Sequence, residues 1–272
     1  MNDQCDGYGT KIFSNGDRFE GEWKEGRRHG RGYLEYVNEA KYDGEFVHGK
    51  KEGYGTLTFV NGDRYQGKWK DGKKHGEGMY VWSNGSQYKG EYVNGKKEGY
   101  GVMIYNNSDM YSGEWLNGKK SGRGIERWLN GEKYDGEWKE GKRHGNGKAW
   151  HAWGETYEGQ YYHDERHGMG TLKNSKAVVY KGNFSEGKLH GKGTITYPTG
   201  HSEPAEWVDG ERVDIPENQF PRGIAPDLTV KPLSSARRRQ LQRRRERLHQ
   251  LHANRSTSGR RRRKKPPIVM VT

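Results

Sequence analysis

Histidines recur in this 272-residue chain at a spacing that could supply metal ligands. Zinc requires its ligands at ~2 Å from one centre, whereas equivalent positions in a stacked β repeat lie ~9.6 Å apart. Glu52, Glu98 and Ser121 occupy the same position in other copies. We therefore interpret the histidines as turn residues and expect neither a metal site nor a cofactor. The histidines are His29, His75, His144, His167 and His190.

Gly-x-Gly pairs also recur, and such pairs can cradle nucleotide phosphates. A phosphate-binding loop follows a strand and opens a helix, but predicted strands flank these pairs on both sides. We interpret them as turn positions. The pairs are Gly7/Gly9, Gly30/Gly32, Gly53/Gly55, Gly76/Gly78, Gly99/Gly101, Gly122/Gly124, Gly145/Gly147, Gly168/Gly170 and Gly191/Gly193.

Glutamates recur at one further position of the repeat, which Lys68 and Gln160 occupy in other copies. A catalytic carboxylate pair needs one water-excluded site in which the two pKa values are separated. A ladder of carboxylates on a sheet is expected instead to pair with Lys and Arg on neighbouring strands. No Ser/His/Asp or Cys/His set stands out, so we expect a protein that is not an enzyme. The glutamates are Glu22, Glu45, Glu91, Glu114 and Glu137.

All three residue types belong to one repeat of 23 residues that runs without insertion or deletion. A fixed period of this length indicates a repeat array. Each copy carries an aromatic-x-Gly-x-aromatic core followed by the Gly-x-Gly pair. The cores begin at Phe19, Tyr42, Tyr65, Tyr88, Tyr111, Tyr134, Tyr157 and Tyr180.

One unit reads as a β-hairpin. Residues 55–59 alternate small polar and apolar side chains, the pattern of a half-buried strand. Residues 60–63 are predicted to turn, with Asn61-Gly62 in a tight type I′ conformation. Residues 64–70 form the return strand.

In that return strand, Tyr65, Gly67 and Trp69 share one face and the charged residues share the other. Glycine is normally disfavoured inside a strand. Its recurrence between two aromatic residues predicts that a ring from a neighbouring strand packs closely over it. Asp71-Gly72 then turns the chain toward the next unit.

The expected fold is all-β, an elongated, twisted, single-layer antiparallel sheet of stacked hairpins, roughly 80 Å long. Two aromatic ladders would run along it. One packs the sheet and is called the structural ladder: Trp23, Phe46, Trp69, Tyr92, Trp115, Trp138, Tyr161, Phe184 and Trp207. The other is called the second ladder, is interrupted at His151 and Asn174, and is the candidate partner-binding groove: Phe13, Tyr36, Phe59, Trp82, Tyr105 and Trp128, with Tyr197 beyond the interruption.

The ninth unit decays, as expected of an end unit that must not offer an open strand edge. Glu203, Pro204 and Ala205 replace its core Tyr, the next residue and the Gly. We predict a lead-in at 1–6, an array of eight full repeats and a degenerate ninth at 7–210, a Pro-containing linker at 211–233, a basic helix at 234–253 and a disordered basic tail at 254–272.

The positive charge of the chain is concentrated in its C-terminal part. The net charge is +13, of which residues 231–272 carry +14 and residues 1–230 carry −1. Acidic protein surfaces such as tubulin tails, anionic lipid, and nucleic acid or an import receptor remain open as targets, as does a solvated tail without a partner. We favour acidic protein and rank nucleic acid low. The candidate anion-binding residues are Arg237, Arg238, Arg239, Arg243, Arg244, Arg245, Arg247, Arg260, Arg261, Arg262, Arg263, Lys264 and Lys265.

Cys5 is the only cysteine, so no disulfide within the chain is possible, which fits a reducing compartment. The N-terminus lacks the apolar run that a signal peptide contains. No segment approaches the ~20 apolar residues of a membrane span. We expect an intracellular, soluble protein.

The repeat resembles the MORN family (membrane occupation and recognition nexus). The resemblance rests on Tyr-x-Gly-x-Trp followed by His-Gly-x-Gly, as at Tyr134–Trp138 and His144–Gly147, and it covers residues 7–207. It implies a non-enzymatic scaffold, most similar to members of ciliary axonemes, radial spokes and the cytoskeleton. The implied partners are proteins that lay a helix or peptide in the groove, with a homodimer also open. The implied location is the cytoplasm, cytoskeleton and axoneme. The alternative is a membrane adaptor that binds phosphoinositides.

Overall fold

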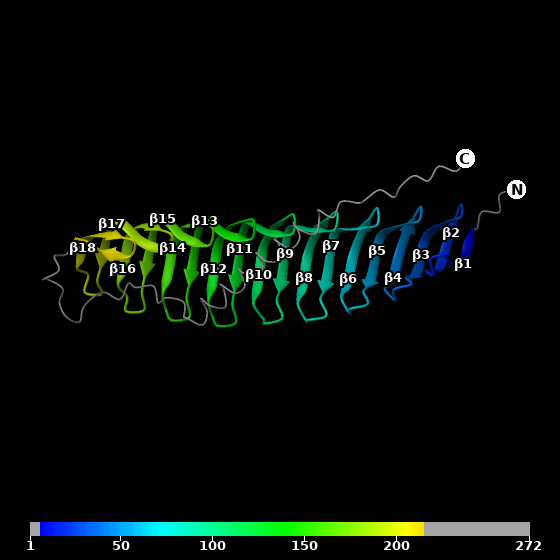
Figure 1. Ribbon diagram of the computed structural model, residues 1–272, viewed down its shortest axis with the longest axis horizontal. Helices are drawn as coiled ribbons and strands as arrows, with labels where there is room; N and C mark the ends of the chain where they lie inside the picture. Colours follow the sequence, from blue (N-terminus) through cyan, green and yellow to red (C-terminus); the bar gives the residue numbers. More distant parts are fainter. Residues whose placement is uncertain (1–5, 215–272) are drawn as a thin grey trace, which may run out of the picture. The chain divides into compact units, whose positions relative to one another are not determined.

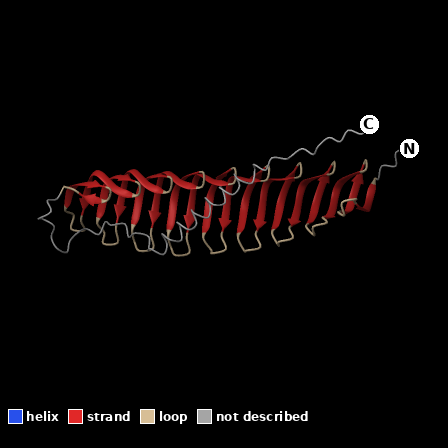
Figure 2. Ribbon diagram, in the orientation of Figure 1, coloured by secondary structure: helices blue, strands red, loops and turns tan. Residues whose placement is uncertain are grey.

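The computed structural model of the chain describes residues 6–214, which form one antiparallel sheet of 19 strands, with no helix in this range. Each strand pairs with its neighbours along the chain, so the sheet grows hairpin by hairpin (Figures 1 and 2). The prediction of an all-β, antiparallel repeat sheet is confirmed. The predicted tail helix at 234–253 and the disordered segment at 254–272 lie outside the described residues.

The strands alternate between nine and seven residues along most of the sheet. They are β1 (Gly7–Ile12), β2 (Arg18–Lys24), β3 (Arg27–Glu35), β4 (Lys41–Val47), β5 (Lys50–Thr58), β6 (Arg64–Lys70), β7 (Lys73–Val81), β8 (Gln87–Val93), β9 (Lys96–Ile104), β10 (Met110–Leu116), β11 (Lys119–Arg127), β12 (Lys133–Lys139), β13 (Lys142–Trp150), β14 (Thr156–Tyr162), β15 (Glu165–Lys173), β16 (Val179–Ser185), β17 (Lys188–Thr196), β18 (Ser202–Val208) and β19 (Glu211–Arg212).

Two kinds of turn join the strands. The short turn has two residues with positive φ, as at Asp71 (50°) and Gly72 (78°), which is the pattern of a type I′ hairpin. The longer turn has positive φ only at its glycine, as at Gly62 (85°), whose N–H donates to the Phe59 carbonyl over 3.0 Å. The prediction of a type I′ turn at Asn61-Gly62 is therefore wrong, because this loop is a type I turn closed by a left-handed residue.

Some units place a residue other than glycine at the left-handed position of the longer turn. Ala177 does so with φ of 61°, and its N–H donates to the Asn174 carbonyl over 3.0 Å. Its methyl group crowds the backbone there, which a glycine avoids.

We expect Ala177→Gly to raise the free energy of unfolding by about 0.5–1 kcal/mol, net of the greater entropy of glycine in the unfolded chain. Urea unfolding followed by circular dichroism measures the change. Ala149→Gly is the control, because Ala149 is buried within β13 and its loss should destabilise. A stability loss at both sites would contradict the assigned strain.

The Gly-x-Gly pairs lie inside strands, eight of them in the nine-residue strands and Gly7/Gly9 in β1, so their interpretation as turns is wrong. The first glycine marks a β-bulge: the pairing of β4 with β5 shifts register between Gly44 and Glu45, and Gly53 opposite has φ of 60°. A bulge adds one residue without ending the strand. The odd-numbered strands from β3 to β17 are consequently longer than predicted, with β5 beginning at Lys50 rather than Gly55.

The second glycine of each pair and the glycine of the aromatic core lie opposite each other and beneath a tyrosine ring. Gly67 pairs with Gly78, and a Cβ on either would lie 2.7 or 2.4 Å from the Tyr65 hydroxyl. The expectation of close packing is confirmed. The ring of Tyr65, however, belongs to the same strand as Gly67 and not to a neighbouring strand. It covers both Gly67 and Gly78, which faces Gly67 on the next strand.

The C-terminal edge of the sheet is closed by side-chain and backbone features. The Val213 N–H donates to the Glu206 carbonyl, so the backbone polar groups of Glu206 point toward this edge. Alternate residues of an antiparallel strand point these groups to the same side, so those of Pro204 point there as well. Pro204 has no N–H, and the Arg212 guanidinium donates to its carbonyl over 3.3 Å. The predicted role of Pro204 at the edge is consistent with this geometry, and β19 extends the sheet into the predicted linker.

No helix long and apolar enough to cross a membrane occurs among residues 6–214.

Candidate partner-binding face

One face of the sheet carries most of the aromatic side chains, and we call it the aromatic face. Its centre is the core column, in which every ring is fully buried. Tyr65 makes edge-to-face contacts with Trp69 on its own strand and Tyr92 of the next unit, each at 5.2 Å between ring centroids. The core column consists of Phe19, Tyr42, Tyr65, Tyr88, Tyr111, Tyr134, Tyr157 and Tyr180.

The structural ladder flanks the core column, and all nine of its members are buried, with exposed fractions of 1–8%. Four of its five tryptophans also satisfy backbone carbonyls, as where the Trp69 indole N–H donates to the Gly55 carbonyl over 3.2 Å, whereas the buried indole N–H of Trp207 has no partner within residues 6–214. On the other side of the ring contact, the Tyr65 hydroxyl donates to the Lys68 carbonyl over 2.9 Å. Each unit is thus bonded to the unit before it through rings as well as through strand pairing.

The second ladder lies on this same face, at the first residue of each longer turn. Phe59 shows the placement, because its N–H donates to the Asp63 carbonyl over 2.8 Å. All six candidate groove residues are half-buried, neither sealed as the structural ladder is nor fully exposed. Their predicted role in binding a partner stays a prediction.

A column of basic side chains, which the sequence analysis missed, lies between the two ladders. Lys51 shows its geometry: its Nζ lies 5.2 Å from the ring centroid of Tyr36, 4.9 Å from Tyr42 and 4.7 Å from Trp69. Such cation–π contacts attract an ammonium to ring faces. We call these residues the cation column: Arg28, Lys51, Lys74, Lys97, Lys120, Arg143 and Arg166.

The signal for this column was present in the sequence. Each member stands two residues before the first glycine of a Gly-x-Gly pair, with Leu189 at the corresponding place in β17. In runs such as Lys50-Lys51, both residues read as solvated charges. The bulge determines which of the two lysine side chains points onto the aromatic face.

Burial lowers the pKa of Lys51 and of Lys97 to about 8, although the ring faces favour the charged form. The unfolded chain keeps these protons up to about pH 10.4. Between these values the unfolded state binds more protons than the folded state, so the free energy of unfolding should rise with pH.

We expect the urea midpoint to increase between about pH 7.5 and about pH 9.5. Lys97→Met should reduce that increase, while Lys96→Met, which removes an exposed neighbour, should preserve it. An identical pH dependence in the two variants would refute the assignment to Lys97.

Carboxylates neutralise the C-terminal part of the cation column. Lys120 pairs with Glu126, and both side chains are nearly buried. Arg143 lies 3.5 Å from the Asp164 carboxylate, and Arg166 pairs with the buried Glu155. These ion pairs are built into the sheet.

The recurring glutamates project from the opposite face and bond to the backbone of the bulge. The Arg123 N–H donates to the Glu114 carboxylate over 2.9 Å, and the Tyr54 N–H donates to Glu45 over 3.0 Å. Gln160 accepts the equivalent bond from Met169. The prediction that this ladder pairs with Lys and Arg is wrong for residues 6–214, where none of the five glutamates forms a salt bridge.

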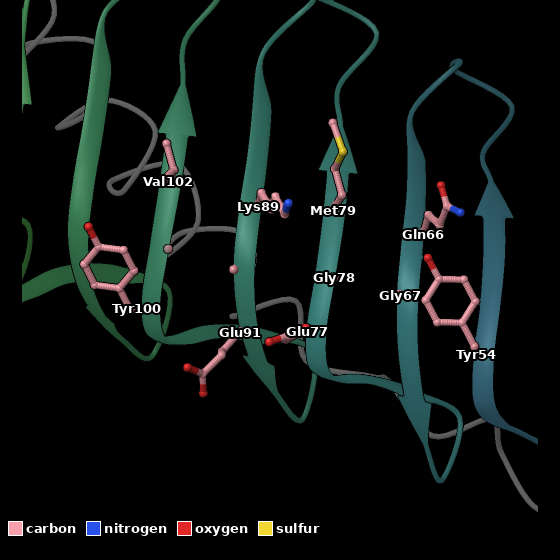
Figure 3. Close-up of a pocket in the computed structure, with 12 residues that line it drawn as sticks. Tyr54, Gln66, Gly67, Glu77, Gly78, Met79, Lys89, Glu91, Tyr100 and Val102 are labelled. Carbon is pink, nitrogen blue, oxygen red and sulfur yellow. The ribbon is translucent and has the colours of Figure 1, made fainter.

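The face that carries the glutamates is hollowed over the glycine pairs. Figure 3 shows a recess between β5 and β9 with Tyr54 and Tyr100 on either side and Met79 between them. Its volume is ≈ 760 Å³, and the two tyrosines are 51% and 59% exposed. The absence of glycine side chains opens the recess.

The histidines lie within strands and not in turns, so that interpretation is also wrong. His144 contacts the ring of His163, with 5.7 Å between centroids. Within residues 6–214, no three His, Cys, Asp or Glu side chains form a group that could hold a metal ion. The candidate anion-binding residues 237–265 lie outside the described residues.

Comparison with known families gives one match along the array. A family described as "MORN repeat" matches residues 1–18, 19–40, 42–64, 65–87, 88–110, 111–133, 134–156, 157–175 and 180–202.

Solved structures with a similar arrangement of strands include the TCP10 domain of Danio rerio CPAP. In complex with a peptide of Danio rerio STIL it is 11% identical, with coverage of 76% of this chain and 93% of that chain and a TM-score of 0.46. Without the peptide it is 12% identical, with coverage of 73% and 94% and a TM-score of 0.42. The CPAP G-box domain is 9% identical, with coverage of 74% and 100% and a TM-score of 0.40.

Proposed function

Because the chain belongs to the MORN-repeat family, we propose that it is a non-enzymatic scaffold that holds partner proteins along its aromatic face. The observation that carries the proposal is the second ladder together with the cation column. Half-buried rings and basic side chains recur at one position per unit on a face that no second layer covers within residues 6–214. Extended aromatic surfaces of this kind are typical of protein-binding sites.

The proposed setting is the cytoskeleton, and within it the ciliary or flagellar axoneme. The support is the resemblance to MORN proteins that consist almost entirely of repeats, and the step is one of family analogy. The basic residues after 230 would add an attachment to acidic protein surfaces, since polybasic segments bind such surfaces without a folded site.

Localisation of the tagged full-length protein and of a 1–230 truncation in ciliated cells tests this setting. We expect signal along the cilium that resists detergent extraction. Loss of that signal in the truncation would assign docking to the basic residues, whereas its retention would assign docking to the array. A full-length signal absent from the cilium would refute the axonemal proposal.

A membrane adaptor is the second candidate, and the basic composition of residues 231–272 supports it. It requires that purified protein binds anionic liposomes in a salt-sensitive way and that truncation after 230 abolishes the binding. Detergent-labile signal at a membrane, together with that binding, would favour the adaptor over the cytoskeletal scaffold.

A further inference from the structure

Three consecutive members of the cation column form no salt bridge with any carboxylate of residues 6–214, although the charge of Asp63 acts on Lys74. Lys51, Lys74 and Lys97 contact aromatic rings, and among residues 6–214 no carboxylate lies within salt-bridge distance of their Nζ atoms. Only Lys97 has a polar contact, a long one of 3.9 Å to the Met103 sulfur. An ammonium offers three donors, so most of this bonding capacity is unused.

The missing partners can be traced to particular positions. Lys120 pairs with Glu126, six residues later, and the corresponding neighbours of Lys51 and Lys97 are Leu57 and Met103. The position that neutralises Lys120 therefore holds an apolar side chain beside Lys51 and Lys97.

The position that pairs with Arg166, eleven residues earlier, is Glu155. For Lys51 and Lys97 the equivalent residues are Ala40 and Ser86. For Lys74 it is Asp63, whose carboxylate instead accepts bonds from the Tyr80 hydroxyl and the Ser83 N–H, both over 2.8 Å.

Two of the three ammonium groups, those of Lys51 and Lys74, retain contact with solvent. Buried side-chain polar atoms that lack a partner within residues 6–214 occur only at His29, His151, Arg166 and Trp207. Lys51 and Lys74 are half-buried, have no hydrogen bond and are absent from that set, so their Nζ atoms keep some contact with solvent. An incoming carboxylate could reach them without displacing any internal bond.

We propose that the aromatic face between β5 and β9 binds an acidic, extended segment of a partner protein, whose carboxylates bond to Lys51, Lys74 and Lys97. This inference rests on the proposed scaffold function and specifies the chemistry of its partner. The basic residues after 230 of this chain have the wrong charge to fill the same site.

The spacing of the lysines selects the conformation of the partner. Successive units are two strands apart, or ~9.6 Å. A polyproline II segment has three residues per turn and a rise of 3.1 Å, so every third residue faces the same side at ~9.3 Å intervals. A helix presents the same side every seven residues, at intervals of ~10.5 Å. This interval matches the lysine spacing less well, and the mismatch grows over three sites. An acid at every third residue is therefore the predicted motif.

The rings beside each lysine suit such a segment. Tyr36 and Trp82 of the second ladder lie beside Lys51 and Lys97, each with its ring centroid 5.2 Å from the Nζ atom. Aromatic-lined grooves bind the preformed polyproline II conformation at low entropic cost. Residues between the acids would pack on these rings while the acids meet the ammonium groups.

The test uses the full chain and labelled peptides of the form (Glu-Pro-Ala)n, with binding measured by fluorescence anisotropy. Control peptides with the same number of acids place them at every second or fourth residue. In the site variant, Lys51, Lys74 and Lys97 become Met, which preserves side-chain length and removes charge. In the matched control variant, the exposed neighbours Lys50, Lys73 and Lys96 become Met.

We expect the site variant to bind the period-three peptide at least about tenfold more weakly and the control variant to bind it within about twofold of the parent. Equal losses in the two variants, or equal affinity for all three peptide spacings, would overturn the proposal. Loss of binding to phosphatidylserine vesicles in the site variant, with peptide binding unchanged, would make this a lipid site and would also overturn it. Detergent-resistant localisation would stand in either case, so failure here is separable from failure of the scaffold function.

Discussion

Trp115→Ala is expected to lower the free energy of unfolding by about 3–5 kcal/mol. The indole is 5% exposed, and its ring centroid lies 5.2 Å from that of Tyr111 and 5.3 Å from that of Tyr88. Its N–H donates to the Gly101 carbonyl over 3.2 Å, so truncation also leaves that carbonyl without its bond. The lost ring contact with Tyr88 joins two units, while the lost bond to Gly101 joins the two strands of one hairpin.

Trp82→Ala is the matched comparison, because it removes the same side chain from the second ladder. Trp82 is half-buried and packs on Tyr80, with 4.6 Å between ring centroids. We expect a smaller cost of about 1–2 kcal/mol, since less apolar area leaves water in the folded state. If the second ladder binds partners, this variant should lose more partner binding than Trp115→Ala relative to its loss of stability.

Urea unfolding followed by far-ultraviolet circular dichroism, with both variants at one protein concentration, measures the difference. Unfolding of a repeat array can begin at a weakened junction between units. Trp115→Ala should therefore also broaden the transition. Equal losses of stability at the two positions would contradict the assignment of distinct roles to the two ladders.

The repeat phase and the two aromatic ladders follow from the sequence because each depends on local periodicity alone. Side chains two residues apart lie on the same face of a strand. The aromatic residues that stand two positions before and after each glycine can therefore bury only that face. With 23 residues per unit and no insertions, Tyr65 and Tyr88 must occupy equivalent places. Stacking then brings their rings into one column.

The bulge could not be predicted in the same way. Glycine at Gly53 is compatible with either a turn or a left-handed residue inside a strand, and local sequence does not separate the two. The distinction depends on the register of the neighbouring strand, where the Glu45 carboxylate accepts the N–H of Tyr54, the residue after Gly53. Since side chains alternate across a strand, an error at this point reverses the face of every residue before it.

The cation column was missed for this reason. Without the bulge, Lys51 is simply one of two adjacent lysines before a turn. With the bulge, it lies on the aromatic face opposite Phe46, and Lys50 pairs with the exposed Asp71. The same correction moves the recurring glutamates from an ion-pair ladder to acceptors of backbone N–H groups.

The glycine pairs give the second large expected effect, in Gly101→Ala. A Cβ at this position would lie 2.3 Å from the Tyr88 hydroxyl and 2.6 Å from its Cζ. The ring cannot move aside readily, because it is fully buried and its hydroxyl donates to the Glu91 carbonyl over 3.2 Å. We expect a loss of about 3 kcal/mol, at the upper end of the usual cost of overpacking.

Gly9→Ala is the control, because Gly9 occupies the same position of the repeat in β1, where no core tyrosine covers it. The nearest atoms to its Cβ would be those of the Trp23 ring at 3.9 and 4.0 Å, which is ordinary contact. The chain itself carries the corresponding change in β18: Ala205 stands opposite Gly193 in the unit where Glu203 replaces the core tyrosine. Glycine is therefore needed only where the ring is present.

A double-mutant cycle tests that dependence. In a Tyr88→Ala background the ring is gone, so adding Gly101→Ala should cost far less than in the parent chain, and the two changes should be strongly non-additive. The free energies of unfolding of the parent, both single variants and the double variant supply the coupling energy. Additive losses would mean that the glycine serves the backbone of the strand pair and not the ring. The recurrence of tyrosine with glycine through the array would then need a separate cause for each residue.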